Sequence, residues 1–416
     1  MSTNMQAIII SAGQSSRCWP VNGGHKSRMK IFGKSLIYWT IKGFIDAGIK
    51  NIVVVTGPNS LIEEEMTLDF QDVDVKLSFV VQEKPIGTGN AIIATEKLIN
   101  QPFFISWPYK INSFTLVEEV LNKQKTSNAQ AVLVGVKTNT PWEFGIFKFN
   151  KGKIVEVVEK PKPKEEPSNI KIVGFYFFEP DFFNYYKSLP QHHEMDFVET
   201  YNIYLQNKKT EFILWEKDLP ELKYPWHFLE IMHIMFKLSN FKNFISSTAQ
   251  IGKNVIIKGD VCIGDNAIIG DNTIISGPCF IGENCKIGAN NILKGPLNLE
   301  NGVITGSFME IENSIVQEKT QFHSGYVGDS IIGQNCCFGA GFITANKRFD
   351  RNNIQTIVKE KKVDTGLTSF GVAIGNNSKF GIQSGTMPGV LIGSNCVVGP
   401  GTLVFKNIKD DTSFFL

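Results

Sequence analysis

The feature that most constrains the fold is an aliphatic residue that returns at every sixth position in the C-terminal half of the chain. A single register contains them all: Ile251, Ile257, Ile263, Ile269, Ile275, Ile281, Ile287 and Leu293. A period of six is neither the period of a helix nor the alternation of a flat strand, so each repeat must combine short strands with sharp turns. A smaller side chain stands four residues after each of the first six: Val255, Val261, Ala267, Thr273, Cys279 and Cys285. The two rows predict a solenoid with a narrow, close-packed interior.

The same register returns further along the chain after an interruption. It reappears at Ile332 and Cys336, and again from Ile374 to Val404. Between Ala345 and Ser369 the period disappears and charged residues become frequent. A solenoid tolerates such an insertion at little cost, and long excursions often carry binding sites. We therefore expect residues 345–369 to leave the solenoid as a functional loop.

Length, charge and cysteine usage limit the class of protein. A chain of 416 residues exceeds one typical core, so two domains are expected. The net charge of +2 and the scattered Lys and Arg residues favour neither nucleic acid nor a membrane surface as a partner. A signal-peptide pattern is lacking and no apolar run reaches the roughly 18 residues of a membrane span, so a cytoplasmic location is expected. Four of the seven cysteines fall on inward positions of the solenoid and are interpreted as structural thiols: Cys279, Cys285, Cys336 and Cys396.

The N-terminal half alternates between apolar strands and helical patterns. A strand at Ala7–Ser11 runs into the loop Ala12–Arg17, and a helical pattern follows from Leu36 to Ala47. Further strands alternate with helices near residues 91–98 and 116–123: Asn51–Thr56, Lys76–Val81, Phe103–Ser106 and Ala131–Val136. This alternation predicts a doubly wound α/β sheet, in which the loop after the first strand faces phosphate groups.

A series of motifs follows in this half of the chain. Its members are Gly13–Arg17 with Pro20 and Lys26, Gly33–Ile37, Gln82 with Pro85 and Gly87–Gly89, Phe144-Gly145, Glu159–Pro161 and Val173–Tyr176. The series resembles the sugar-1-phosphate nucleotidylyltransferases, which implies a Rossmann-like nucleotidyltransferase domain. The resemblance implies that Gly13, Arg17 and Lys26 meet the phosphates, the two cations acting in catalysis. It also implies a set of substrate contacts: Gln82, Gly87, Thr88, Gly145, Glu159, Lys160 and Asn169.

A second series lies in the solenoid. It consists of His323–Ser330, Phe338–Gly341 and the stretch from Ala345-Asn346 to Arg348–Asp350. This series resembles the acetyltransferase half of the bifunctional family that makes UDP-N-acetylglucosamine, in its archaeal form. The resemblance implies a left-handed parallel β-helix, a homotrimer, and acetyl-CoA as cofactor beside Ala340. It further implies His323 as the general base, with substrate contacts from Tyr326, Asn346 and Lys294.

The first site departs from the pattern of the family at the metal. Tyr109 stands where the resemblance places the first of two Mg²⁺-binding aspartates, and Glu221 stands at the second position. A phenol with a pKa of about 10 is a poor Mg²⁺ ligand. Ser15 also replaces a glycine of the loop, where a positive φ becomes harder to adopt. We therefore expect nucleotidyl transfer to be weak or absent. The alternative is an active nucleotidylyltransferase in which Glu194 or Asp196 supplies the missing carboxylate.

The second site departs from its pattern at the acceptor. Glu312 occupies the position of a lysine that binds the sugar phosphate, Lys294 replaces an arginine, and Cys337 replaces an asparagine. A carboxylate repels a phosphate. Glucosamine-1-phosphate is therefore a poor match as acceptor, and acetyl transfer to another amino-sugar phosphate or to an altered acceptor stays open.

The predicted organisation is a nucleotidylyltransferase-like domain over residues 1–230, a linker helix over 231–245 and a β-helix over 246–416. The linker belongs to an amphipathic helical pattern that runs from Trp226 to about Phe244. The expected ligands are a sugar phosphate or a nucleotide sugar. A different class of function also remains open, namely a non-catalytic sugar-nucleotide-binding or scaffolding subunit that assembles with an active paralogue.

Overall fold

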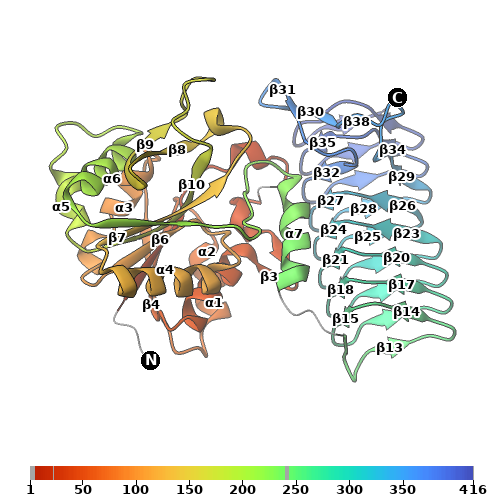
Figure 1. Ribbon diagram of the computed structural model, residues 1–416. Coiled ribbons are helices and arrows are strands. Elements are labelled where there is room, and N and C mark those ends of the chain that lie inside the picture. The colour runs from red at the N-terminus through yellow and green to blue at the C-terminus, as the bar shows by residue number, and fades with distance from the viewer. Residues whose placement is uncertain (1–4, 22, 239–242, 416) are drawn as a thin grey trace. The chain divides into compact units, whose positions relative to one another are not determined.

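The computed structural model describes residues 5–21, 23–238 and 243–415. The chain forms two compact units (Figure 1). The first, which we call the sheet unit, comprises the chain up to Gln14 together with Leu36–Leu219. The second, the solenoid unit, comprises Ser15–Ser35 together with the chain from Pro220 onward. The segment 15–35 therefore groups with the solenoid, whereas the sequence analysis assigned it to the first domain.

The sheet unit is built on one mixed sheet with the strand order β11-β7-β10-β6-β1-β4-β5, and β8 and β9 extend it as a hairpin. Its strands are β1 (Gln6–Ser11), β4 (Asn51–Thr56), β5 (Lys76–Val81), β6 (Phe103–Ser106), β7 (Ala131–Lys137), β8 (Gly145–Asn150), β9 (Lys153–Glu159), β10 (Ile170–Phe178) and β11 (Thr210–Leu214). The strand β10 runs antiparallel to β6 and β7, while β1, β4, β5 and β6 pair in parallel. The predicted doubly wound α/β sheet is confirmed.

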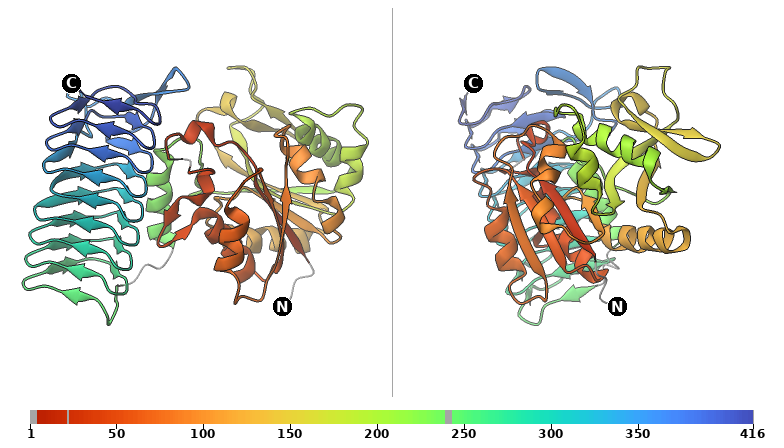
Figure 2. Two further views of the ribbon diagram at one scale, coloured as in Figure 1. Left: turned by 180° about the vertical axis from the view of Figure 1, so that it is seen from behind. Right: turned by 90° about the vertical axis from the view of Figure 1, so that its left-hand side faces the viewer.

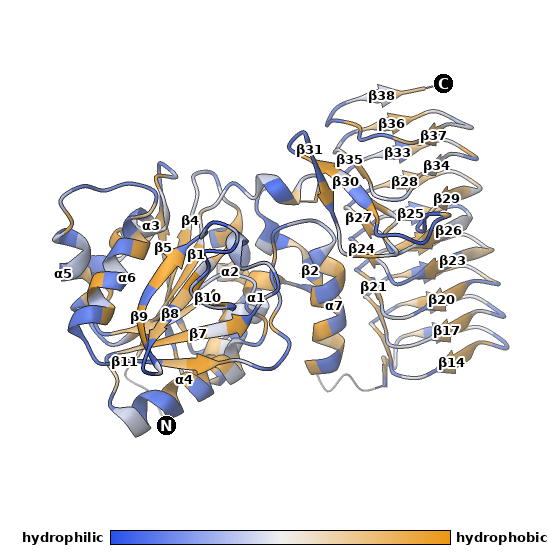
Figure 3. Ribbon diagram, turned by 45° about the horizontal axis from the view of Figure 1, so that its top comes forward, coloured by the Kyte–Doolittle hydropathy of each residue, from blue (hydrophilic) through white to orange (hydrophobic). Residues whose placement is uncertain are grey.

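Successive apolar residues of each strand point to opposite faces of this sheet, so both faces are hydrophobic and helices cover both. The helices are α1 (Leu36–Asp46), α2 (Ile62–Asp69), α3 (Thr88–Ile93), α4 (Ser113–Ser127), α5 (Phe182–Lys187) and α6 (Asp196–Asn207), with short 3₁₀ turns at Glu96–Leu98 and Pro141–Glu143. Ala7 and Ile9 belong to the same buried cluster as residues of α1, α2 and α4. Ile8 belongs to the cluster that contains residues of α3, α5 and α6. The hydrophobic central strands are visible in Figure 3.

The solenoid is a left-handed parallel β-helix with three faces, each a parallel sheet (Figure 2). The first face contains β12 (Phe244–Ile245), β15 (Val261–Ile263), β18 (Cys279–Ile281), β21 (Leu297–Leu299), β24 (Ile315–Val316), β27 (Ile331–Ile332), β32 (Val372–Ile374) and β35 (Val390–Ile392). The second contains β13 (Gln250–Ile251), β16 (Ile268–Ile269), β19 (Lys286–Ile287), β22 (Ile304–Thr305), β25 (Gln321–Phe322), β28 (Cys337–Phe338), β33 (Lys379–Phe380), β36 (Val397–Val398) and β38 (Ser413–Phe414). The third contains β14 (Ile256–Lys258), β17 (Ile274–Ser276), β20 (Ile292–Lys294), β23 (Met309–Glu312), β26 (Gly325–Gly328), β29 (Phe342–Thr344), β34 (Gly385–Thr386) and β37 (Leu403–Val404).

The two rows predicted from the period of six fill the solenoid interior. Ile263 pairs with Ile281, and Ile281 pairs with Leu299, so one coil contains three repeats of six residues. The aliphatic row is buried from Ile263 to Leu293, and the four predicted structural thiols are buried with it. Ile251 is 40% exposed, because its strand belongs to the first coil and has a neighbour on one side only.

Two further parts belong to the solenoid unit. The segment 15–35 forms 3₁₀ turns at Ser16–Cys18 and Lys26–Arg28 and the small hairpin of β2 (Lys30–Ile31) and β3 (Lys34–Ser35). Helix α7 (His227–Leu238) packs against β24. The predicted helix from Trp226 to Phe244 is too long, since Phe244 already lies in β12; residues 239–242 of that prediction lie outside the described residues.

The insertion 345–369 leaves the coils as predicted. It folds into the antiparallel hairpin of β30 (Gln355–Val358) and β31 (Lys361–Asp364). A bridge between Lys347 and Ser369 closes its base. Among the helices formed by the described residues, none has the length and apolar character that crossing a bilayer requires.

Candidate active sites

A network of polar side chains joins successive coils on the third face of the solenoid. The Tyr326 hydroxyl donates a hydrogen bond to Glu312 Oε1 (2.5 Å) and accepts one from Asn346 Nδ2 (3.0 Å). Asn346 Nδ2 also donates to Asp329 Oδ2 (2.6 Å), and Asn313 Nδ2 donates to Asp329 Oδ1 (2.5 Å). The structure thus brings the predicted residues Tyr326 and Asn346 together. A Cβ on Gly328 would collide with the Tyr326 hydroxyl, so glycine is needed at that position.

Burial and neighbouring carboxylates govern the charges in this network. The pKa of Tyr326 is raised above its ordinary value, first by burial and then by its hydrogen bond to Glu312, so the phenol remains protonated. Burial also raises the pKa of Asp329, although Asn313 and Asn346 oppose the shift by donating to the carboxylate. Lys294 forms an ion pair with Glu310 and lies 3.8 Å from Glu312, so this predicted substrate residue already has acidic partners.

His323 stands outside this network. It follows β25, and its backbone N–H donates to Phe338 O (3.0 Å). The side chain is exposed, and no hydrogen bond joins its imidazole to any other described residue. An exposed imidazole can meet an incoming amine, which the predicted role as a general base requires.

The network extends to a histidine that the sequence analysis missed. His233, in the middle of α7, has Nε2 2.6 Å from Asn313 Oδ1. Asn313 has a positive φ of 42°, which places it at a turn where its side chain can bond to both His233 and Asp329. A histidine within an otherwise apolar helix pattern is the only sequence signal that could have pointed to this contact.

Small residues border the site predicted for acetyl-CoA. Ala340 lies at the corner after β28, and its carbonyl accepts the Gln383 N–H (2.7 Å). A Cβ on Gly339 would come within 2.7 Å of Ile382 N, so this corner admits no larger side chain. The exposed side chain of Ile382 lies beside it. The acetyl-CoA that the resemblance implies beside Ala340 would also meet the exposed Ile382.

The predicted base-reading residues lie together in the sheet unit. Gln82 is buried, and its Nε2 donates to Gly87 O (2.9 Å) and to Asn90 Oδ1 (3.0 Å). Gly87 has a φ of 130°, and a Cβ there would lie 3.1 Å from Glu194 Cα. Thr88 begins α3. This close backbone approach explains why the segment needs glycine.

The predicted sugar-side residues lie on the hairpin of β8 and β9. Gly145 pairs with Glu159, and a Cβ on Gly145 would lie 2.8 Å from Glu159 Oε2. Burial raises the pKa of Glu159, and Lys160, 3.9 Å away, opposes the shift. Lys160 itself is exposed. Asn169 is exposed beside this hairpin and contributes its carbonyl oxygen to Thr138 N–H (2.9 Å), so its side chain is free to face solvent.

The phosphate-facing loop divides between the two units after Gln14, which places Gly13 in the sheet unit and Arg17 and Lys26 in the solenoid unit. The expectation that Ser15 resists a positive φ is wrong, because its φ is 53°. Its hydroxyl accepts the Lys26 N–H (3.1 Å), and this bond stabilises the turn. Lys26 Nζ donates to Leu222 O (2.6 Å), and burial lowers the pKa of Lys26. Arg17 is exposed.

Of the two positions where the resemblance implies Mg²⁺-binding carboxylates, Glu221 offers one and Tyr109 does not. Within residues 5–21, 23–238 and 243–415, no group of three or more His, Cys, Asp or Glu side chains could hold a metal ion. Tyr109 offers a phenol, and the next residue, Lys110, is a cation with only 3% of its surface exposed. Glu221 lies in the solenoid unit.

Glu194 and Asp196, the two alternative metal ligands, make contacts with the base-reading segment. Asp196 is buried and accepts the Tyr186 hydroxyl (2.5 Å), with its carboxylate packed against Gly89. Glu194 is exposed and its backbone packs against Gly87. Both therefore lie at the base-reading segment, and Asp196 already serves a structural role there.

Comparisons with known proteins cover both units. Residues 6–219 match the model described as nucleotidyl transferase, and residues 260–294 and 371–406 match the model described as hexapeptide repeat of succinyl-transferase. The chain is 35% identical to the bifunctional protein GlmU of Methanococcus maripaludis strain C7, covering 98% of this chain and 96% of that protein. It is 32% identical to the bifunctional protein GlmU of Methanocaldococcus jannaschii, with 98% and 97% covered. It is 30% identical to the bifunctional sugar-1-phosphate nucleotidylyltransferase/acetyltransferase of Sulfurisphaera tokodaii, with 97% and 98% covered.

These matches span the sheet unit and the solenoid in the same order as in the relatives, and they agree with the motifs found in both halves. The chain therefore belongs to the family of bifunctional sugar-1-phosphate nucleotidylyltransferases and acetyltransferases.

Proposed function

We propose that the chain is a transferase of sugar-nucleotide metabolism whose principal reaction is acetyl transfer to an amino-sugar acceptor. The observation that carries this proposal is the network of Tyr326, Asn346 and Asp329 on the third face. Hydrogen bonds hold these side chains in fixed orientations before any acceptor binds. Such preorganisation lowers the entropic cost of placing an acceptor near a reacting group.

Glu312 favours an acceptor other than glucosamine-1-phosphate. Its carboxylate accepts the Tyr326 hydroxyl and lies near Lys294, where the family resemblance implies a phosphate-binding lysine. A carboxylate repels phosphate and attracts an ammonium group. The proposed acceptor is therefore an amino sugar whose positive amino group, rather than a phosphate, lies near Glu312.

His323 supplies the proton transfer in this proposal. When bound, acetyl-CoA supplies the acetyl group as an activated thioester. The exposed imidazole of His323 takes a proton from the attacking nitrogen, which forms the new amide bond as the carbon–sulfur bond breaks. CoA leaves as a thiolate and takes up that proton, so the products are the amide and free CoA. Tyr326 and Asn346 orient the acceptor through their remaining hydrogen-bonding capacity.

The sheet unit is proposed to bind a nucleotide or nucleotide sugar while its nucleotidyl transfer is weak. The buried Gln82 and the close turn at Gly87 support base binding. Tyr109 weighs against a magnesium-dependent reaction because it puts a phenol at one of the two positions where a carboxylate is expected, and the buried Lys110 beside it adds a cation.

The solenoid is proposed to form a homotrimer. Hexapeptide β-helices of this family present flat faces, and the third face carries a row of exposed aliphatic side chains: Ile256, Ile292, Ile343 and Leu403. Burying such a row against a second copy removes apolar surface from water.

A panel of acceptors tests the main proposal. Purified full-length protein is incubated with acetyl-CoA and with glucosamine, glucosamine-1-phosphate or a nucleotide-linked amino sugar, and free CoA is measured. We expect faster CoA release with an acceptor that lacks a terminal phosphomonoester. A strong preference for glucosamine-1-phosphate would refute the altered acceptor, and no release with any amino sugar would favour the scaffolding alternative.

A further inference from the structure

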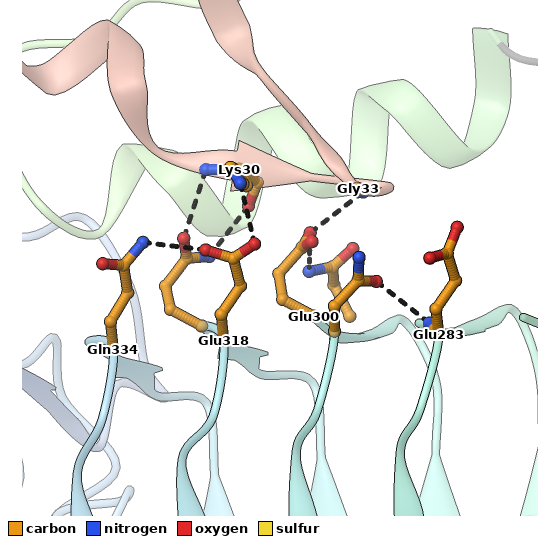
Figure 4. Close-up of polar contacts among 9 residues, drawn as sticks. Lys30, Gly33, Glu283, Glu300, Glu318 and Gln334 are labelled. Atoms are coloured by element: carbon orange, nitrogen blue, oxygen red, sulfur yellow. Dashed lines mark hydrogen bonds and ion pairs between the residues drawn. The ribbon is translucent and has the colours of Figure 1, made fainter. Parts of the chain in front are cut away.

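The small hairpin of β2 and β3 docks on the first face of the solenoid through its turn. Phe32 and Gly33 have φ values of 58° and 77°, as in the tight turns that join two short strands. The Phe32 N–H donates to Asn298 Oδ1 (2.9 Å), and the Gly33 N–H donates to Glu300 Oε1 (3.2 Å). Asn298 Nδ2 also donates to Glu300 Oε1 (2.9 Å). The turn thus gives its backbone donors to solenoid side chains, as Figure 4 shows.

A second set of bonds holds the strand that leads into this turn. The Lys30 N–H donates to Gln317 Oε1 (3.2 Å), while Gln317 Nε2 donates to Lys30 O (2.8 Å). Lys30 Nζ lies 2.7 Å from Glu318 Oε1, and Gln334 Nε2 donates to Glu318 Oε2 (3.1 Å). Gln317 therefore pairs with the Lys30 backbone as a neighbouring strand would, and the hairpin has fixed register on the coils (Figure 4).

Glu300 and Gln317 break a pattern of the solenoid. The residue that follows the inward aliphatic of each first-face strand is glycine in most coils: Gly264, Gly282, Gly333, Gly375 and Gly393. The next coil explains the glycine, since a Cβ on Gly282 would lie 2.8 Å from Asn301 N. Apart from Ser246 in the first coil, the exceptions among the strands β12 to β35 are Glu300 and Gln317. Both of these coils donate hydrogen bonds to the hairpin or accept them from it through their side chains.

Burying the Glu300 carboxyl costs free energy. It is 0% exposed, and its Oε2 has no hydrogen-bond partner within the described part of the chain. Burial raises the pKa of Glu300 to about 7, while the bonds from Asn298 and Gly33 and the charge of Lys30 oppose the rise and Glu318 adds to it. An apolar residue would avoid this cost. The carboxyl is best explained by the backbone N–H group that it accepts.

The docked segment carries the two cations of the phosphate-facing loop. Lys26 lies between two attachments to the solenoid, and Arg17 precedes both of them in the chain. One is the hairpin, and the other is Trp19, whose Nε1 donates to Asp410 Oδ2 (2.9 Å). The path of the chain between these attachments therefore depends on the first face and on the last coil.

We propose that Asn298, Glu300 and Gln317 are positioning residues for nucleotide binding, and that the solenoid sets the place of Arg17 and Lys26 by holding the hairpin. The inference rests on the proposed function, in which the chain binds a nucleotide, and on the family resemblance, which implies that these two cations meet its phosphates. It assigns the solenoid a second task, separate from the acetyl-transfer network on its third face.

Substitution of Glu300 tests this assignment in the full-length protein. Glu300→Leu removes the acceptor and leaves the Gly33 N–H without its partner, so we expect affinity for nucleoside triphosphates, measured by calorimetry, to fall about tenfold. Glu300→Gln keeps an acceptor oxygen and should stay close to wild type. The matched control is Glu283→Leu, because Glu283 is an exposed carboxylate one coil earlier whose side chain makes no bond to the hairpin (Figure 4).

The pH dependence provides a readout that simple loss of folding would not give. Burial of an ionised carboxylate is unfavourable, so docking of the hairpin should weaken as Glu300 loses its proton. The nucleotide affinity of the wild type should therefore fall as the pH rises from 6 to 8. The affinity of Glu300→Gln should change less over the same range. Acetyl transfer and particle mass should be unchanged in both variants, which excludes global unfolding. Equal affinity and equal pH profiles in wild type and Glu300→Leu would overturn the inference.

Hydrogen exchange separates this inference from the proposed function. Peptides covering residues 15–35 should exchange faster in Glu300→Leu than in wild type, whether or not nucleotide is present. In Glu283→Leu their exchange rate should equal that of wild type. If wild type binds none of the four common nucleoside triphosphates, the proposed nucleotide binding fails, and with it the positioning role. If exchange in 15–35 is the same in wild type and Glu300→Leu, the Glu300 bond does not stabilise the docked hairpin. The inference then fails even if nucleotide binding is observed.

Discussion

Glu312 and Glu300 are two carboxylates on different faces of one solenoid. They differ in the groups that bond to them. Glu312 is half-buried and faces side chains, the Tyr326 hydroxyl and the Lys294 ammonium. Glu300 is fully buried and accepts a backbone N–H of the hairpin turn. At Glu312 the bonds orient side chains, whereas at Glu300 a bond to the backbone fixes a chain segment. We propose that the same scaffold provides an open site for an acceptor, at Glu312, and a closed site that positions another part of the chain, at Glu300.

The largest expected effect is at the open site, at the proposed base. His323→Ala should reduce acetyl-CoA-dependent CoA release by about a hundredfold or more, the scale for loss of a general base. Affinity for acetyl-CoA should change little, because its proposed contacts are Ala340 and Ile382. His193→Ala, an exposed histidine of the sheet unit, is the control. Equal CoA release by wild type and His323→Ala would show that the imidazole takes no part.

The next effect concerns the charge of the open site. Glu312→Lys should lower the KM for a sugar-1-phosphate acceptor about tenfold, because it replaces a repelling carboxylate by a phosphate-binding cation. Glu310→Lys, on the same strand, is the matched control, since Glu310 pairs with Lys294 but makes no bond to Tyr326. Steady-state kinetics with both variants measure this. An unchanged KM in Glu312→Lys would mean that the acceptor phosphate does not approach this position.

A third prediction extends the comparison to the sheet unit, in which Tyr109 stands at a position where the resemblance implies a carboxylate. Tyr109→Asp combined with Ser15→Gly should raise magnesium-dependent pyrophosphate release about tenfold over wild type. Ser15→Gly alone should change little, because Ser15 already adopts the positive φ. If the double variant is no more active than Ser15→Gly, the missing carboxylate does not limit the reaction.

The smallest effect is at the closed site and appears as a slope with pH. The pKa of Glu300 is about 7 in the folded chain, above its ordinary value of 4.5, so the folded state holds a proton that the unfolded state releases. This contribution to stability is complete below about pH 4.5 and is lost as the pH rises through 7. Glu300→Gln should flatten the dependence of the melting temperature on pH by about 2–4 °C over that range. A slope equal to that of wild type would assign the titration to other groups.

Those parts of the fold that follow from local pattern could be predicted from the sequence. The interior rows of the solenoid were evident because packing repeats every six residues, and the strands β4, β5 and β6 have the predicted bounds. The end of α7 was wrong, because the apolar pattern continues from the helix into the first coil.

The sites were less predictable because they depend on contacts between distant parts of the chain. Tyr326 and Asn346 lie together as the motif implied, but the bond from His233 to Asn313 joins a helix to a coil, and a histidine in an apolar helix pattern does not by itself name its partner. The break in the glycine row at Glu300 was visible in the sequence. Its meaning was not, because the partner, Gly33, lies far away in the chain.

The balance between the two chemistries tests the central claim most directly. One reaction mixture contains full-length protein, acetyl-CoA, an amino sugar, Mg²⁺, a nucleoside triphosphate and a sugar-1-phosphate, and both free CoA and pyrophosphate are measured over the same time. We predict CoA release that depends on His323 and pyrophosphate release close to background. Robust magnesium-dependent pyrophosphate release without CoA release would contradict the account.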